Sequence, residues 1–194
     1  MKGIGISAMT ATIFNVNIST PTITLVGTGA SLNYLEPLDV RKAGEMSIVF
    51  SINMAYKVFP SDYIFISDRK MAEVLRKDGI YNVICPDIYN KGNFAYEYDR
   101  DKFKTSKTKH VDSAYNCVRL IKQIVKCETL LLYGFDYYVD EGQHFYENGA
   151  YEITTEEPNA FRDRLDKYCA LVKEELESAP FRVVQMNPDS RLQF

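Results

Sequence analysis

The sequence predicts an α/β fold with a mostly parallel sheet of about six to seven strands flanked by helices. Two observations support this prediction. Short apolar runs rich in β-branched residues alternate along the chain with segments of helical period. The clearest helical segment places Ala114, Val118, Ile121 and Val125 on one stripe, at spacings of four, three and four residues. Strands that alternate with helices are typical of parallel sheets joined by right-handed crossovers.

The expected strands are short apolar runs at residues 22–26, 48–53, 62–68, 82–85, 128–133 and 181–186. The helices expected between them begin at capping residues and cover residues 32–35, 38–43, 69–77, 113–126 and a final segment from about residue 159. Residues 1–20 have no clear helical period, so we expect an edge strand or a hairpin there.

The 194 residues fit a single domain, 1–194, because one hydrophobic core can serve ~200 residues. Residues 87–111 interrupt the alternation, since they lack an apolar period and end in a basic run. We expect a mobile loop at about 87–111 that acts as a lid over a site. Lys107 and Lys109 are either part of a solvated run or groups that neutralise a leaving phosphate, and His110 has the same two readings.

Composition favours a small-molecule ligand. The net charge of −3 argues against a broad nucleic-acid surface. The four cysteines form no C-x-x-C pair, which indicates buried thiols in a reducing cytoplasm rather than a zinc site or a disulfide framework. No run approaches the ~20 apolar residues that a membrane span needs.

A glycine turn, Gly27-Thr28-Gly29, follows the first apolar run and leads to Ser31. Backbone amides in such a turn can bind a phosphate or a sugar, and the alternative is a plain tight turn. The turn is not a complete dinucleotide fingerprint, because Leu32 stands at the third glycine position, and no Gly-Lys-Ser/Thr of a P-loop follows.

Polar residues end three later strands. Asn53 can bind a base or a sugar, and Asp68 a ribose hydroxyl or a metal ion, although each can instead cap a helix. Asp136 follows Gly134 and is either a site residue or part of a turn. Ligands collect at the carboxyl ends of parallel strands, so these side chains are expected near the glycine turn. His144, one of two histidines, is either a group for acid-base chemistry at this edge or a surface histidine.

Four segments in the same order resemble the bacterial lipooligosaccharide sialyltransferases and the related 6-hydroxymethylpterin diphosphokinase-like family. They are Leu25-Val-Gly-Thr-Gly-Ala-Ser-Leu32, Val49-Phe-Ser-Ile-Asn53, the helix 113–126 with the strand Leu130-Leu-Leu-Tyr-Gly-Phe-Asp136-Tyr-Tyr138, and Asn187-Pro-Asp-Ser-Arg-Leu192. The chain departs from the family at Thr28, where the family has asparagine, and at Ala30, where it has proline. The histidine of the sialyltransferases has no clear counterpart, and His144 is the substitute.

The resemblance implies a Rossmann-like, nucleotide-sugar-binding domain. By this likeness the nucleotide contacts are Gly27, Thr28, Gly29, Ser31 and Asn53, and the residues near the departing phosphate are Tyr137, Tyr138 or Tyr146. Asp68 is closer to the diphosphokinase-like branch, where an acidic residue at this place suits magnesium-nucleotide chemistry.

The expected function is therefore a glycosyltransferase that moves a sugar from a nucleotide-activated donor, CMP-linked in the sialyltransferases, to an acceptor hydroxyl. His144 or Asp136 would take the proton, and Tyr137 and Tyr146 would stabilise the leaving phosphate without a metal. One alternative is magnesium-dependent diphosphate transfer from ATP to a hydroxymethyl compound, with Asp68 and Asp136 holding the metal. The other is a catalytically silent nucleotide-binding protein. The acceptor (a glycan or a modified nucleoside) and a homo-oligomeric state stay open.

Overall fold

The computed structural model describes residues 12–13, 18–33, 47–92, 94–99, 112–137 and 158–194. An eight-stranded sheet of order β1-β7-β6-β5-β4-β3-β9-β10 forms its centre, and all of its strand pairings are parallel. In chain order these strands are β1 (Thr12–Ile13), β3 (Thr22–Val26), β4 (Ser47–Ile52), β5 (Tyr63–Phe65), β6 (Val83–Pro86), β7 (Tyr96–Tyr98), β9 (Thr129–Tyr133) and β10 (Arg182–Gln185). Two short strands, β2 (Ile18–Ser19) and β8 (Val125–Lys126), pair separately. The predicted α/β, Rossmann-like fold is confirmed.

Helices connect the strands as the alternation predicts. They are α1 (Arg69–Lys77), α2 (Asp87–Asn90), α4 (Ser113–Ile124) and α5 (Pro158–Glu177), with 3₁₀ helices η1 (Ala30–Asn33) and η2 (Asn53–Lys57). Aspartates cap two of them: the Asp68 carboxylate accepts from the Met71 amide at 2.8 Å, and the Asp112 carboxylate from the Ala114 amide at 3.3 Å. None of the described helices is long and apolar enough to cross a lipid bilayer.

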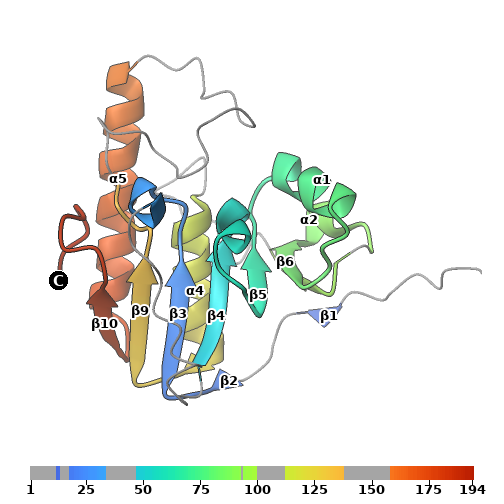
Figure 1. The fold of residues 1–194 in the computed structure, drawn as a ribbon, viewed down its shortest axis with the longest axis horizontal. Coiled ribbons are helices and arrows are strands. Elements are labelled where there is room, and N and C mark those ends of the chain that lie inside the picture. Colours follow the sequence, from blue (N-terminus) through green and yellow to red (C-terminus); the bar gives the residue numbers. More distant parts are fainter. Residues whose placement is uncertain (1–11, 14–17, 34–46, 93, 100–111, 138–157) are drawn as a thin grey trace, which may run out of the picture.

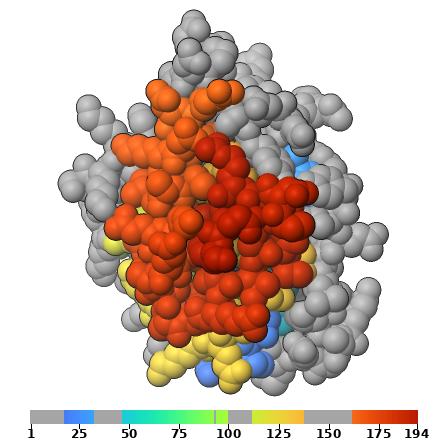
Figure 2. All heavy atoms as spheres, turned by 90° about the vertical axis from the view of Figure 1, so that its left-hand side faces the viewer, coloured from blue at the N-terminus to red at the C-terminus, as the bar shows by residue number. Residues whose placement is uncertain are grey.

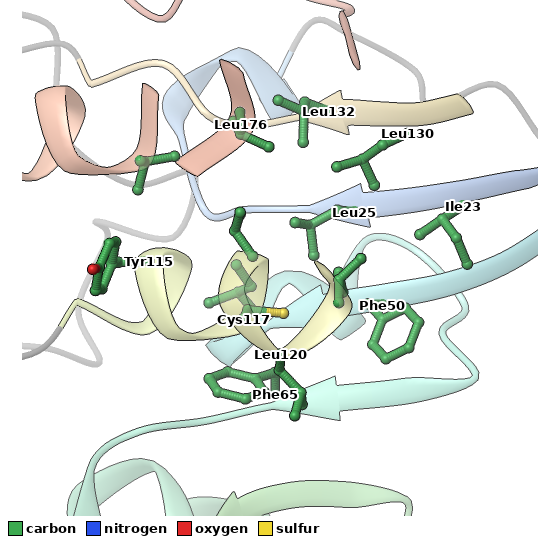
Figure 3. Close-up of a cluster of buried hydrophobic side chains, with 14 of the residues drawn as sticks. Ile23, Leu25, Phe50, Phe65, Tyr115, Cys117, Leu120, Leu130, Leu132 and Leu176 are labelled. Carbon is green, nitrogen blue, oxygen red and sulfur yellow. The ribbon is translucent and has the colours of Figure 1, made fainter. Parts of the chain in front are cut away.

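Successive side chains of the strands point to opposite faces of the sheet, and an apolar layer forms on each face. Ile23 and Leu25 of β3, together with Leu130 and Leu132 of β9, belong to the main core cluster with α4 and α5. Figure 3 shows these side chains gathered beside α4. On the other face of the sheet, alternate residues of β5 and β6 form a separate cluster with α1. The result is a three-layer arrangement in which helices cover both faces of a parallel sheet.

One expectation needs correction, and another is settled between its two alternatives. Within the expected loop at 87–111, the structure contains α2 and β7, and β7 extends the sheet beside β6. Tyr98 of β7 is buried, and its ring stacks on that of Phe65 at 5.1 Å between centroids. Its sequence, Tyr96-Glu97-Tyr98, contains no continuous apolar run of the kind that predicts a buried strand. In the N-terminal segment, β1 is an edge strand of the main sheet, which is one of the two alternatives expected. Both β1 and β2 pair in parallel with a distant strand, so the described part of residues 1–20 contains no hairpin.

The expected helix at 38–43 and residues 100–111 of the expected loop lie outside the described residues.

The strand order reverses at β3. From β3 the chain adds β4, β5, β6 and β7 successively on one side, and then returns to place β9 and β10 on the other side. The strands of the main sheet point the same way, so the segments after β3 and β9 leave from one edge, which we call the carboxyl edge (Figure 1). In open α/β sheets, ligands bind outside the carboxyl ends of the strands at such a reversal.

Candidate functional site

The glycine turn after β3 packs directly against the segment after β9. The Gly27 amide donates to the Tyr133 carbonyl at 2.7 Å, and the Gly29 amide donates to the Gly134 carbonyl at 2.8 Å. A Cβ atom on Gly27 would lie 2.5 Å from the Gly134 carbonyl oxygen, far inside contact distance. Close backbone approach therefore explains why glycine stands at position 27.

Asp136 lies beneath this turn, and its side chain is almost completely buried, at 2% exposure. Its carboxylate accepts three hydrogen bonds: from the Ser31 amide at 2.7 Å, from the Ser31 hydroxyl at 2.7 Å and from the Asn187 side-chain amide at 2.9 Å. A Cβ atom on Gly29 would lie 2.3 Å from the Asp136 Oδ2 atom. Asp136 thus joins the ends of β3 and β9 to the residues that follow β10.

The backbone amides of the glycine turn are largely used inside the protein. The amides of Gly27 and Gly29 bind carbonyl oxygens, the Ser31 amide binds Asp136, and the Leu32 amide donates to the Gly29 carbonyl at 3.2 Å. A phosphate placed against these amides would also meet the negative charge of Asp136. Of the two sequence readings, the geometry fits a tight packing turn better than a phosphate loop.

A C-terminal segment, Asn187–Leu192, completes this part of the carboxyl edge. The Ser190 hydroxyl donates to the Phe135 carbonyl at 2.6 Å, and the Arg191 amide donates to the Asp136 carbonyl at 3.1 Å. The Arg191 side chain donates to the Tyr137 carbonyl at 3.1 Å and pairs with Asp166 of α5. Figure 2 shows α5 and the C-terminal residues lying side by side on the side of the molecule that α5 and β10 form. This segment is one of those that resemble the sialyltransferase family, but the residue patterns alone predicted no role for it.

Tyr137 faces the interior of the protein. Its backbone has a left-handed φ of 56°, its ring packs against the main core cluster, and its hydroxyl donates to the Asp112 carboxylate at 3.4 Å. Burial, and secondly the nearby Asp112 carboxylate, raise the pKa of the Tyr137 phenol well above its usual value. Burial likewise raises the pKa of Asp112. The phenol therefore stabilises the start of α4, and this geometry does not direct it toward a leaving phosphate.

Asn53 lies at the same edge, one strand from the glycine turn. The register pairs Val26 with Ser51, so Thr28 and Asn53 each follow two residues after this last pair of β3 and β4. Asn53 has a left-handed φ of 51°, and its side-chain oxygen Oδ1 is buried with no hydrogen-bond partner among the described residues. An unpaired buried acceptor is costly, so its retention points to a partner that a ligand can supply.

Asp68 and Asp136 do not fit a shared magnesium ion. The Asp68 carboxylate caps α1, and burial raises its pKa. The two residues follow β5 and β9, which have β4 and β3 between them, so three strand spacings place them about 14 Å apart. Magnesium requires its oxygen ligands at ~2.0–2.1 Å. Within the described parts of the chain, no three His, Cys, Asp or Glu side chains converge on a common point.

Further polar groups that the sequence did not single out lie where α4 begins. The hydroxyls of Ser67, after β5, and Ser113, at the start of α4, are 2.5 Å apart. Asn116 follows one turn later on the same helix face. It is 2% exposed, and its Oδ1 atom has no partner within the described segments.

The remaining candidates, Tyr138, His144, Tyr146, Lys107, Lys109 and His110, lie outside the described residues. The structure therefore brings together Gly27, Gly29, Ser31 and Asp136, with Thr28 and Asn53 beside them, and it assigns Asp68 and Tyr137 to helix ends. Comparison of the sequence with protein-family models and with curated proteins finds no match.

Proposed function

We propose that this protein is a glycosyltransferase that uses a nucleotide-activated sugar, and that the donor binds at the carboxyl edge where the strand order reverses. The observation that carries this proposal is the buried Oδ1 atom of Asn53, which has no hydrogen-bond partner in the described part of the chain. A nucleobase or ribose offers N–H and O–H donors of the kind that this oxygen lacks. The position of Asn53 beside the reversal is where α/β domains bind nucleotides.

In this proposal Asn53 and the residues of the glycine turn bind the nucleoside portion of the donor. His144 remains the candidate base for the acceptor hydroxyl, and Tyr138 and Tyr146 remain candidates for the leaving phosphate. These three roles rest on the resemblance. The geometry argues against diphosphate transfer from ATP, because the two metal ligands expected for it, Asp68 and Asp136, follow strands that are separated by two others.

Binding is tested first. The purified chain is titrated with CMP-, UDP- and GDP-sugars and with ATP, with and without magnesium, while its melting temperature is recorded. A nucleotide present at 100 times its Kd stabilises the folded state by ~2.7 kcal/mol. We expect at least one nucleotide-sugar to stabilise the protein without magnesium. A chain that none of these compounds stabilises would contradict the proposal.

The Asn53→Gly variant tests whether the side-chain amide of Asn53 contacts the nucleotide. Glycine accepts the left-handed backbone of Asn53, so the change removes the amide group without straining the chain. Loss of one or two hydrogen bonds should weaken nucleotide binding about 10-fold. The matched control is Lys91→Gly, because Lys91 has a similar φ of 48° and lies in the turn after α2. Equal affinities in the two variants would exclude Asn53 from the site.

Transfer is tested separately. The His144→Ala variant should retain nucleotide binding while donor turnover falls by a factor of roughly 10² to 10⁴, the usual contribution of a general base. Binding without any turnover in the unmodified chain would instead favour the catalytically silent alternative.

A further inference from the structure

Three hydrogen-bond donors, from two residues far apart in the sequence, converge on one buried carboxylate. They are the Ser31 amide, the Ser31 hydroxyl and the Asn187 side-chain amide, at 2.7, 2.7 and 2.9 Å from the oxygens of Asp136. Donors aimed at a single charged acceptor are what proteins use to bind an anion. Here the bound anion is the protein's own carboxylate.

The same contacts leave no room for a second anion. The space beneath the turn is filled so tightly that a single methyl group on Gly29 would lie 2.3 Å from Oδ2 and 2.7 Å from Cγ of Asp136. A ligand phosphate would have to displace the carboxylate or approach it as a like charge with little water between them.

We infer that Asp136 is the built-in anion of the glycine turn: a positioning residue that occupies the place a ligand phosphate would take. Asp136 fixes the turn through Ser31 and ties it to the C-terminal segment through Asn187. A ligand at this turn therefore presents uncharged hydroxyl or amino groups to it. If the ligand is a nucleotide donor, which rests on the proposed function, its nucleoside portion faces the turn. Its phosphate then points away from the turn.

Chemical rescue tests the anion position without reference to any nucleotide. The Asp136→Ala variant leaves the three donors around an empty place of carboxylate size. Sodium formate at ten times its Kd should raise the melting temperature of this variant by about 3 to 5 °C above sodium chloride of equal ionic strength. Unmodified protein and the Asp189→Ala variant, which loses an exposed carboxylate of the same segment, should show no such difference.

The Ser31 amide supplies a second measurement. Its ¹⁵N–¹H resonance reports the charged hydrogen bond to Asp136, so it should move in the Asp136→Asn and Asn187→Ala variants. Inorganic phosphate should leave it unchanged in unmodified protein and should move it in Asp136→Ala. If Asp136→Ala folds only in formate, the yield of refolding in formate against chloride gives the same answer.

The inference is overturned if formate fails to stabilise or refold Asp136→Ala, or if phosphate moves the Ser31 resonance of unmodified protein. Failure of every nucleotide to bind would contradict the proposed function alone, since the formate and phosphate measurements do not depend on it.

Discussion

Replacing Gly29 by alanine should destabilise the folded protein by ~3 kcal/mol, mainly through the effect of one methyl group on Asp136. The new Cβ atom would lie 2.3 Å from Asp136 Oδ2 and 2.7 Å from the Gly134 carbonyl oxygen. Neither neighbour is the free end of a flexible side chain. The Gly134 oxygen belongs to the backbone, and the carboxylate is held by three hydrogen bonds.

The magnitude follows from the two ways of relieving the contact. If the carboxylate moves by about 1 Å to reach ordinary contact distance, it weakens its bonds to Ser31, and a hydrogen bond to a charged group is worth about 1.5–3 kcal/mol. If the backbone moves instead, overpacking costs typically ~1–3 kcal/mol. A loss near 3 kcal/mol lowers the melting temperature of a chain of this size by about 6 to 12 °C.

Urea unfolding followed by circular dichroism measures the effect. Gly79→Ala is the control, because Gly79 has a φ of 69° and a Cβ atom there would meet nothing within 4 Å. Its cost comes from the left-handed backbone alone, at ~1–2 kcal/mol. The double variant Gly29→Ala, Asp136→Ala should lose less stability than the two single changes together, because the contact with the carboxylate is absent. Additive losses, or a Gly29→Ala cost below that of Gly79→Ala, would refute the reasoning.

Two further outcomes are expected. Burial raises the folded-state pKa of Asp112 above its unfolded value of 3.8, so the stability associated with its protonated form is complete below pH ~4 and is lost as pH rises through the folded pKa. Asp112→Asn keeps the cap of α4, and its free energy of unfolding relative to the unmodified protein should rise between pH 4 and pH 8, with a flat difference arguing against burial as the cause. Burial also raises the pKa of the Cys127 thiol to about 11, and burial raises the pKa of the Cys117 thiol well above its usual value. Ellman's reagent should therefore react slowly with the native protein, with half-buried Cys127 ahead of Cys117, whereas denatured chain should react at four thiols, and rapid native labelling of Cys117 would contradict its buried position.

The fold was predictable because its strongest signals are local. β3 reads as a buried strand because β-branched residues fill it, and it is paired on both sides. The bounds of α1 match the predicted 69–77, because Asp68 and Gly79 mark its two ends in the sequence. β7 escaped prediction because Tyr96-Glu97-Tyr98 contains no continuous apolar run, so only its pairing with β6 identifies it as a strand.

The site was less predictable, because the sequence indicates which residues reach the carboxyl edge and not what they bind there. The convergence of Ser31 with Asp136 follows from strand ends that parallel topology brings together. The use of Asp136 as an acceptor for Asn187 depends on how the chain returns after β10, which no local pattern records. Asp68 illustrates the same limit: a carboxylate after a strand can cap a helix or bind a ligand, and only the contact with Met71 identifies the cap.

The position of β3 between β4 and β9 also bears on the order in which the protein folds. During synthesis the glycine turn leaves the ribosome early, and β4 follows it closely, but β9 and Asn187 come from the last third of the chain. Contacts between residues so far apart in sequence form slowly, because a long loop must close before they contribute. We therefore expect an early intermediate in which one edge of β3 is unpaired. Until β9 pairs with it, that edge of β3 is open to association with other chains, so destabilising β9 should lower the folding yield.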